Sequence, residues 1–344
     1  MELNKKICRF ISEEAKRQNL AEYKILPFNK NIIATQIAQL IPQKADTTYP
    51  EYLKSTWNKR LLIEDSYLGW VKSALIVAVD SHNIPSLKFD LPQSANFAVS
   101  GLVAGYASQK NDYHLHLSEI LANFAKGITQ LAEREVKTEI SVDTKPVAEK
   151  ALAFISGLGT FGKNTCVNVS KHGCGTFIGI LFTDLKYPDT KSYMSSTENT
   201  SNPLSHLCNS CNLCIEACPT GALNPQLPGT FKHKLCRCHL NIEKKTELSD
   251  LERKLLGNWV FACDLCISSC PHTNAEKPIE LDLEWLLLGD DKKIKKLVDF
   301  TTMKFPGLKK LRKNAVAVLL NKALPDSHKL LKKYKEKIKN SFSS

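Results

Sequence analysis

The stretch Cys208-Asn209-Ser210-Cys211-Asn212-Leu213-Cys214-Ile215-Glu216-Ala217-Cys218-Pro219 decides the architecture of this part of the chain. A second run follows as Cys263-Asp264-Leu265-Cys266-Ile267-Ser268-Ser269-Cys270-Pro271. These are bacterial ferredoxin spacings, in which three thiolates of one run hold a 4Fe–4S cluster and the cysteine before proline reaches the other cluster. Two near-copies of so long a spacing predict two iron–sulfur clusters, with a zinc ribbon as the alternative.

The second run contains only three cysteines, so two complete clusters need one more ligand. Cys236 and Cys238 lie between the runs and are the candidates. Pairwise exchange assigns one cluster to Cys208, Cys211, Cys214 and Cys270. It assigns the other to Cys218, Cys263, Cys266 and either Cys236 or Cys238. A disulfide framework is the competing account of the twelve cysteines, but the chain is long and its cysteines are concentrated in one third of it.

The remaining composition is that of a soluble globular protein of two or three domains, at 344 residues and 43% hydrophobic content. No run approaches the ~20 apolar residues of a membrane span. The charged N-terminal segment has no apolar core of a signal peptide. We therefore expect a cytoplasmic protein with no membrane contact. A monomer is a separate expectation, which no feature of the composition decides.

Positive charge is concentrated at the C-terminal end. Residues 292–344 contain sixteen Lys or Arg and three Asp or Glu, whereas the whole chain has a net charge of +12. This distribution predicts contact with a polyanion; a solvated helical face is the alternative, and an anionic membrane is a weaker one. The candidate contacts are Lys309, Lys310, Arg312 and Lys313, expected on the polar side of one helix, and Lys244 and Lys245 nearer the cysteine runs.

The pattern along the chain predicts an α+β protein of three parts: an α/β domain over residues 1–190, a ferredoxin-like domain over 203–280 and a basic helical tail over 281–344. Hydrophobic periodicity predicts strands at 75–79, 137–142 and 177–182 and helices at 113–135 and 146–156. A polar linker covers 192–202. Further helices are expected at 281–288, 294–300, 307–322 and 327–338, the last two forming an antiparallel pair packed on the cluster domain.

Several motifs resemble the epoxyqueuosine reductase family over residues 59–321. The resemblance is carried, in order, by Asp112-Tyr113-His114, the segment 142–151 (VDTKPVAEKA), the turn 157–165 (GLGTFGKNT), Phe177-Ile178-Gly179, Thr183-Asp184-Leu185, both cysteine runs and Arg312-Lys313-Asn314-Ala315. These enzymes use cobalamin and iron–sulfur clusters in the last step of queuosine synthesis in tRNA. The resemblance implies a cobalamin-binding α/β domain, a two-cluster ferredoxin-like module and HEAT-like C-terminal helices.

The resemblance also implies roles for single residues. Asp143 would donate a proton to the substrate, which an aspartate does well when burial or a like charge raises its pKa; its alternative role is the N-cap of the helix near Pro146. Asp112, Tyr113 and His114 would lie around cobalamin and the substrate, and their alternative role is helix capping and core packing. Arg60 would lie near the corrin ring, and its alternative is a surface position without a role. The cobalamin contacts would be Arg60, Asp112, Tyr113, His114, Asp143, Gly157, Gly159, Gly162, Lys163, Val167 and Ile178.

The family pattern further assigns the eighth cluster ligand to Cys236, which leaves Cys238 as a free thiol near the second cluster. Gly105 is a departure, because some relatives have a cysteine there near cobalamin. The short C-terminal end is another, because some relatives continue with further helical repeats.

The resemblance therefore implies that the chain reduces epoxyqueuosine to queuosine at the wobble position of tRNA. Electrons would pass singly from an unidentified donor through two 4Fe–4S clusters to cobalamin. One alternative is a corrinoid reductase of a small molecule, which needs no basic tail. Another is an electron carrier or cluster-based sensor, which leaves the glycine turn and the segment around Asp143 unexplained.

Overall fold

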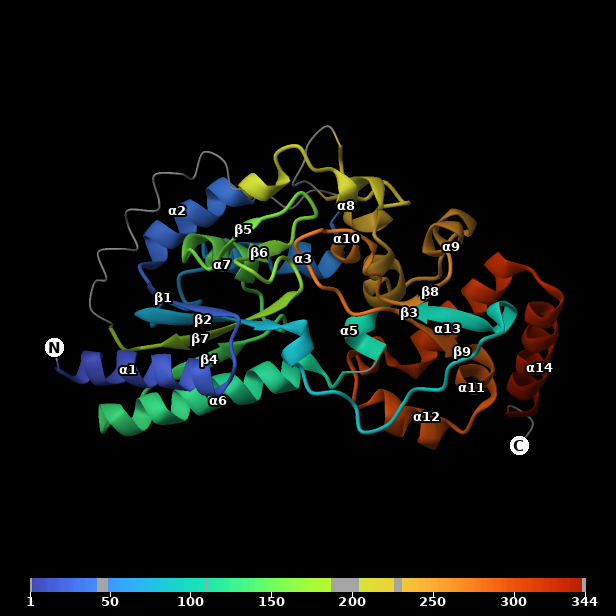
Figure 1. The fold of residues 1–344 in the computed structure, drawn as a ribbon, viewed down its shortest axis with the longest axis horizontal. Coiled ribbons are helices and arrows are strands. Elements are labelled where there is room, and N and C mark those ends of the chain that lie inside the picture. Colours follow the sequence, from blue (N-terminus) through green and yellow to red (C-terminus); the bar gives the residue numbers. More distant parts are fainter. Residues whose placement is uncertain (1, 42–48, 109, 187–203, 226–230, 342–344) are drawn as a thin grey trace.

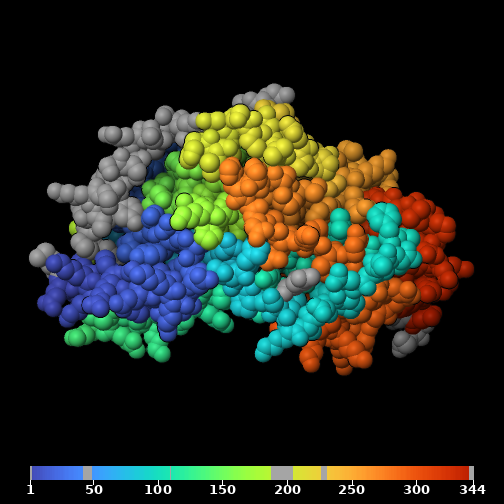
Figure 2. All heavy atoms as spheres, in the orientation of Figure 1, coloured from blue at the N-terminus to red at the C-terminus, as the bar shows by residue number. Residues whose placement is uncertain are grey.

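The computed structural model describes residues 2–41, 49–108, 110–186, 204–225 and 231–341. The chain forms an elongated molecule with an N-terminal sheet and its helices at one end and the C-terminal helices at the other (Figure 1). The cysteine-bearing segments lie between them, as the yellow and orange surfaces of Figure 2 show. Most of the expected linker at 192–202 falls outside the described residues. In the described part of the chain, no helix is both long and apolar enough to cross a membrane.

The N-terminal unit is built on a four-stranded antiparallel sheet. Its order is β1 (Glu22–Pro27), β2 (Ser73–Asp80), β7 (Thr176–Thr183) and β4 (Thr138–Ser141). Side chains alternate along β2, so that Leu75 and Val77 enter one core and Ala74 and Ile76 the other. Both faces are therefore buried, which explains why β2 reads as a continuous apolar run.

Helices cover the two faces of this sheet. One face carries α1 (Glu2–Arg17) and α6 (Tyr113–Ala132), which pack on each other and bury Ile11 and Phe124 (Figure 1). The other carries α2 (Lys30–Leu40) and α7 (Glu149–Ile155). The smaller elements of this unit are α3 (Glu51–Ser55), α4 (Trp57–Arg60) and the hairpin of β5 (Gly159–Phe161) and β6 (Val167–Val169).

The strands and the long helix predicted in this unit are confirmed, but the start of α7 is not. The helix begins at Glu149 rather than near Pro146, and its N-cap is Ala148. Proline disfavours helical geometry at the preceding residue, here Lys145, so the turn persists until the chain has passed it. Asp143 therefore does not cap this helix.

A second sheet joins distant segments. Strand β3 (Ser100–Val103) lies between β8 (Trp259–Phe261), to which it is parallel, and β9 (Ile279–Asp282), to which it is antiparallel. Val103, Ala104 and Ala107 consequently pack in one core with residues 259–331. Part of the region expected to form the first domain thus packs with the cluster-bearing and C-terminal segments. The helix expected from Leu281 is also corrected, because Leu281 belongs to β9.

The C-terminal part is helical. It contains α11 (Leu283–Leu288), α12 (Asp291–Val298), α13 (Gly307–Lys322) and α14 (Pro325–Ser341). Helix α13 packs on α14, on β8 and on α9 (Asp250–Leu256), and it buries Leu311, Ala315 and Val318. The expected helix pair on the cluster-bearing part is therefore present. Short helices complete the chain: α5 (Gly105–Ser108), α8 (Leu213–Glu216) and α10 (Leu265–Ser268).

Candidate functional site

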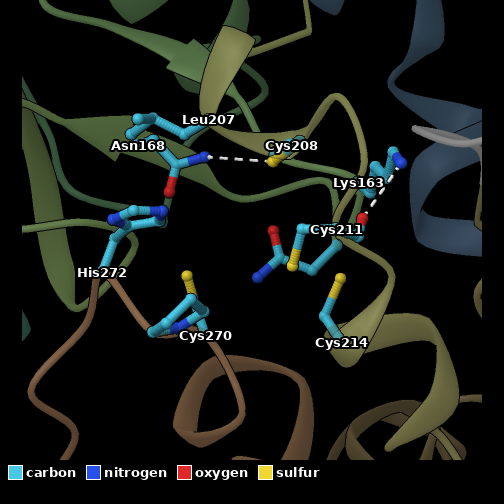
Figure 3. Close-up of a pocket in the computed structure, with 11 residues that line it drawn as sticks. Lys163, Asn168, Leu207, Cys208, Cys211, Cys214, Cys270 and His272 are labelled. Carbon is cyan, nitrogen blue, oxygen red and sulfur yellow. Dashed lines mark hydrogen bonds between the residues drawn. The ribbon is translucent and has the colours of Figure 1, made fainter.

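Four cysteines from both runs line one pocket. Cys208, Cys211 and Cys214 come from the first run around α8, and Cys270 comes from the second run after α10 (Figure 3). The two short helices pack on each other, which places the cysteine before Pro271 opposite the first run. The structure thus brings together the four cysteines that pairwise exchange assigns to one cluster.

The turn after Gly157 supports this pocket. The buried ammonium of Lys163 donates to the carbonyls of Asn209 and Cys211, at 3.2 and 3.0 Å, and to the side-chain oxygen of Asn212 at 2.9 Å. Asn168 lies with its amide nitrogen 4.0 Å from the Cys208 sulfur (Figure 3). Lys163, expected beside cobalamin, is therefore placed against the backbone of the first cysteine run.

The glycines of the same turn have different surroundings. Gly157 has a φ of +72° and open space where a Cβ would be, whereas a Cβ on Gly159 would lie 2.4 Å from the carbonyl of Asn168. Gly159 therefore allows the close pairing of β5 with β6. Gly162 lies in the lining of the cysteine pocket, Val167 is buried in β6, and Ile178 is partly buried in β7.

The second group of cysteines gathers around Cys263 and Cys266. The Cys238 thiol lies 3.7 Å from the carbonyl of Cys263. A hydrogen bond from Cys238 lowers the pKa of the Cys236 thiol to about 7, against the opposing effect of burial. Cys236 and Cys238 thus lie within hydrogen-bond reach of each other at the second cysteine group, and the choice of Cys236 as the ligand rests on the family pattern.

Cys218, the remaining member of the second set, is surrounded by hydrogen-bond donors. Burial raises the pKa of its thiol, but the Thr220 hydroxyl and the backbone N–H groups of Leu223, Thr220 and Ala222 bring it below its ordinary value. All twelve cysteines are free of disulfides, so the disulfide framework is not formed. Among the described residues, no three His, Cys, Asp or Glu side chains gather closely enough to hold a single ion; in a cubane each thiolate binds a different iron.

Asp143 lies on an exposed loop between β4 and α7. Its φ of +54° is left-handed, and its carboxylate accepts a hydrogen bond from the Tyr113 hydroxyl at 3.3 Å. Glu149 accepts from the Asp143 backbone N–H at 2.9 and 3.0 Å. Glu149 therefore holds the main chain of Asp143, a role that its place in the motif at 142–151 did not reveal.

An aromatic group surrounds this carboxylate. Tyr113 stacks on Phe177 and on His114, with ring centroids 3.9 Å apart in each pair, and Tyr106 of α5 packs edge-on against Tyr113 and Phe177. Burial raises the pKa of Tyr113 well above its ordinary value, and the charge of Asp143 raises it further. Tyr113 is thus a neutral donor to Asp143.

Asp112 has the capping role weighed as its alternative. It is the N-cap of α6, accepting from the backbone N–H of His114 at 3.0 Å, and it is 2% exposed. Burial raises its pKa, but hydrogen bonds from His114 and from Lys304, at 2.7 and 2.8 Å, bring it down to about 2. This buried carboxylate holds His114 and orients the start of the helix that carries Tyr113.

Tyr106 connects the acid with the second cysteine group. Burial raises the pKa of Tyr106 well above its ordinary value, and the nearby charges of Cys238, Asp264 and Asp143 raise it further. Tyr106 packs against Tyr113, which donates to Asp143, and the neighbouring amide of Gly105 donates to Asp264, the residue after the candidate ligand Cys263. No periodicity or motif in the sequence marks this tyrosine.

Arg60 closes the same region from α4. Its guanidinium donates to the carbonyl of Val147 at 3.1 Å, on the loop that carries Asp143. The hydroxyl of Tyr67 is buried without a hydrogen-bond partner among the described residues. Burial raises the pKa of Tyr67 to about 12, and the charge of Arg60 opposes this rise. Arg60 is therefore not an isolated surface arginine.

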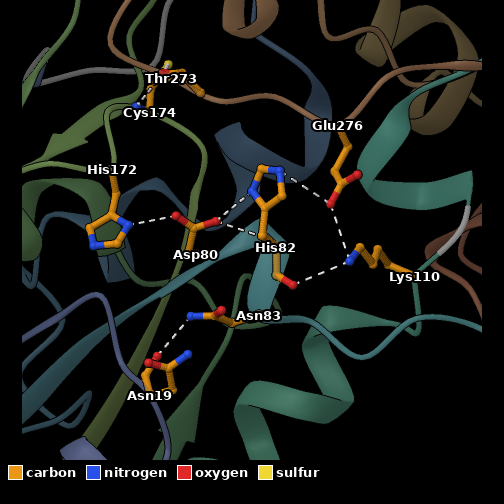
Figure 4. A network of polar contacts seen from close by, with 9 residues as sticks. All are labelled: Asn19, Asp80, His82, Asn83, Lys110, His172, Cys174, Thr273 and Glu276. Atoms are coloured by element: carbon orange, nitrogen blue, oxygen red, sulfur yellow. Dashed lines mark hydrogen bonds and ion pairs between the residues drawn. The ribbon is translucent and has the colours of Figure 1, made fainter.

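The N-terminal sheet is tied to the second cysteine run by a polar network (Figure 4). Asp80, at the end of β2, lies 2.6 Å from His172 Nδ1 and 2.9 Å from His82 Nδ1. Glu276, which follows the second run, lies 3.7 Å from His82 Nε2 and 3.3 Å from the ammonium of Lys110. These contacts fix the sheet that positions Asp143 relative to the cysteines.

The structure corrects the placement of Arg312. This side chain is only 13% exposed and donates to the Leu286 carbonyl at 2.9 Å and to Asp291 at 2.7 and 3.1 Å. It links α13 to α11 and α12 and does not lie on a free polar face, because α11 and α12 pack where solvent was expected.

The other candidate polyanion contacts differ in whether they are exposed or paired with a carboxylate. Lys313 pairs with Glu247, and Lys244 pairs with Glu252 at 2.9 Å. Burial lowers the pKa of the partly buried Lys310. Lys245 and Lys309 are exposed, and Lys309 lies at a groove that Lys313, Tyr334 and other side chains of α13 and α14 also line.

Gly105 explains one departure from the family pattern. A Cβ at this position would lie 2.3 Å from the backbone oxygen of Glu276, so a cysteine does not fit without movement of the main chain. The amide of Gly105 donates to the buried carboxylate of Asp264 at 2.7 Å. The position therefore serves the contact with the second cysteine run.

The fold and the site define an iron–sulfur protein that joins a two-cluster module to an α/β unit with a hydrogen-bonded carboxylate. Residues 207–273 match the family described as a 4Fe-4S double cluster binding domain. An epoxyqueuosine reductase of Listeria monocytogenes is 32% identical over 250 residues, which are 68% of this chain and 61% of the relative. One of Bacillus subtilis is 28% identical over 282 residues, 76% of this chain and 68% of the relative. The chain is thus similar to epoxyqueuosine reductases, and it spans about three fifths of the length of the Listeria monocytogenes relative.

Solved structures agree with this relationship at the level of the fold. Epoxyqueuosine reductase from Streptococcus thermophilus matches with a TM-score of 0.69 at 22% identity, covering 98% of this chain and 86% of that protein. An epoxyqueuosine reductase in complex with an epoxyqueuosine-modified tRNA-Tyr stem loop matches with a TM-score of 0.68 at 21% identity, covering 94% and 84%. The mixed α/β architecture with its central cluster-bearing part is thus shared.

Proposed function

We propose that this chain reduces epoxyqueuosine to queuosine in tRNA, with electrons passing from two 4Fe–4S clusters through cobalamin. The observation that carries the proposal is the pair of contacts made by α5: Tyr106 packs against Tyr113, which donates to Asp143, and the amide of Gly105 donates to Asp264 of the second cysteine run at 2.7 Å. A proton donor and a cluster therefore border the same region. The names of the relatives from Listeria monocytogenes and Bacillus subtilis supply the substrate.

The residues around Asp143 fit a large planar cofactor with polar groups at its rim. Tyr106, Tyr113 and Phe177 form an aromatic wall. The guanidinium of Arg60 and the unpartnered buried hydroxyl of Tyr67 suit the peripheral amides of cobalamin. What cobalamin supplies when bound is electron delivery from cobalt to an epoxide carbon.

The chain's own side chains would manage the protons. Conversion of an epoxide to an alkene consumes two electrons and two protons and releases the oxygen as water. Asp143 would deliver a proton to the departing oxygen, because it is the exposed carboxyl of this site. Tyr113 would orient it through the hydrogen bond at 3.3 Å.

The most direct test is nucleoside analysis of bulk tRNA from cells that lack this chain. Loss of queuosine with accumulation of epoxyqueuosine is the expected result. A normal queuosine content would contradict the proposal, provided that no second reductase is present in the strain. Anaerobic reconstitution with added cobalamin provides a second test, since a bound corrinoid spectrum is expected.

The tRNA would be held through its phosphates by the basic C-terminal helices, which we propose to be HEAT-like, and by lysines between the two cysteine runs. Replacing the exposed Lys245 and Lys309 by alanine is expected to weaken tRNA binding and to flatten its salt dependence. Each lost phosphate contact removes roughly 0.7 to 0.9 from the slope of log K against log salt. Binding titrations between low and moderate salt measure this slope.

The matched control replaces Lys5 and Lys16 of α1, which are exposed at the opposite end of the molecule (Figure 1). It removes the same charge from a surface distant from the C-terminal helices. Equal slopes in the two double variants would mean that net charge alone governs binding. Arg312 is left intact in both, because its loss would disturb the packing of α13.

A further inference from the structure

One carboxylate closes the loop that carries Asp143. Glu149 is the first residue of α7, and Ser141 is the last residue of β4. The hydroxyl of Ser141 donates to Oε1 of Glu149 at 2.5 Å. Both of its oxygens also accept from the backbone N–H of Asp143, at 2.9 and 3.0 Å. Glu149 therefore joins the strand, the loop and the helix through a single side chain.

The backbone of Asp143 needs such support. A φ of +54° is costly for a residue with a side chain, and such conformations persist only where surrounding contacts hold them. The Asp143 amide is held by Glu149, and its carboxylate is held by the Tyr113 hydroxyl. The position of the carboxylate thus depends on one contact at each end of the residue.

We propose that Glu149 is the positioning residue of Asp143: its ionised carboxylate holds the Asp143 amide and thereby keeps the Asp143 carboxylate against Tyr113. The assignment rests on the proposed function, in which Asp143 is the proton donor. Glu149 itself need not touch the substrate, since it acts through the main chain of the loop.

The surroundings of Glu149 disfavour the ionised form of its carboxyl group. Burial, followed by the charge of Asp143, raises the pKa of Glu149 from its ordinary 4.5 to about 7, while Ser141, the Asp143 amide and Arg60 oppose the rise. Tyr67 and Tyr113 also face Glu149. The folded state binds the Glu149 proton more tightly than the unfolded chain does. The contribution of this group to the free energy of unfolding therefore falls as the pH rises from 4.5 to about 7. The folded state therefore disfavours the ionised form of Glu149 relative to the unfolded chain, which is better explained by function than by stability.

The first test needs neither substrate nor cofactor turnover. Glu149→Gln is nearly isosteric. Because the Asp143 nitrogen donates to both oxygens, at 2.9 and 3.0 Å, the substitution replaces one of the two acceptors by an –NH₂ group in either orientation and removes the negative charge that strengthens the remaining hydrogen bond. Hydrogen exchange of the Asp143 amide at pH 8 is expected to accelerate roughly tenfold or more relative to the wild type. Exchange in β7 is expected to stay unchanged. Ser141→Ala is the matched control, because it removes a partner of Glu149 but leaves the amide held.

The second test is a double-mutant cycle on turnover. Glu149→Gln is expected to lower turnover roughly 10- to 100-fold, because misplacement of a reacting group is costly. The same substitution is expected to have no effect in an Asp143→Asn background. The loss in Glu149→Gln should also be largest above pH 7, where the wild-type carboxylate is ionised.

Unchanged exchange of the Asp143 amide in Glu149→Gln would overturn the proposal, and so would an equal loss of turnover in both backgrounds. If Glu149→Gln does not fold, Glu149→Asp, which is shorter by one methylene, replaces it in both tests. Absence of reductase activity in the wild type would count against the proposed function alone, since the exchange experiment is independent of the substrate.

Discussion

Replacement of Asp143 by asparagine is expected to lower the rate of epoxyqueuosine reduction by about 10² to 10⁴, the usual contribution of general acid catalysis. Asparagine has nearly the same shape and tolerates the left-handed backbone at this position, so the loop is expected to keep its conformation. Its amide cannot deliver a proton to the departing oxygen. Single-turnover assays under anaerobic conditions, with iron content and corrinoid binding measured on the same sample, give the comparison.

Asp65→Asn is the matched control, because it makes the same chemical change at an exposed position of the same unit. It is expected to leave turnover within about threefold of the wild type. Two results would remove Asp143 from the role of acid. One is an Asp143→Asn variant with near-normal turnover, and the other is a variant that has lost its iron or its corrinoid.

Replacement of Cys270 by alanine is expected to remove the cluster of the first cysteine run. Cys270 lies in the second run, but it lines a pocket with Cys208, Cys211 and Cys214. Reconstituted protein should contain about eight irons per chain and the variant about four, by the rule of four thiolates per cubane. Iron and sulfide analysis with electron paramagnetic resonance of the remaining cluster would measure this. Reductase activity is expected to be lost, because the electron path is interrupted.

Cys236 and Cys238 provide the controls for this experiment. Cys238→Ala is expected to retain about eight irons, whereas Cys236→Ala is expected to lose the second cluster. The reverse pattern would exchange the assignment of the pair. If Cys270→Ala instead lost the cluster that depends on Cys263 and Cys266, ligation would be uncrossed and the pocket in Figure 3 would have another purpose.

The sequence was sufficient for features that depend on local spacing. Three cysteines separated by two residues each can reach one cubane through tight turns, so the cluster runs were readable without a fold. The sequence also predicted α6 and β2. A helix with one buried face repeats apolar residues every three or four positions, and a strand buried on both faces is a continuous apolar run. The Asp143 motif was recognised by resemblance, but its alternative role as a helix cap could be dismissed only from the backbone.

The tertiary structure decided whatever depends on residues far apart in the chain. It packed Tyr106 against Tyr113, the donor to Asp143, and it buried Arg312 against α11 and α12. It placed Lys163 against the first cysteine run rather than in the surroundings of Asp143. The physical reason is the same in each case: hydrogen bonds and desolvation depend on distances in space, and hydrophobic periodicity reports only which side of an element is covered. The sequence by itself therefore determined which chemical groups this protein carries, and the packing of β3 between β8 and β9 and of α8 on α10 determined which of them meet.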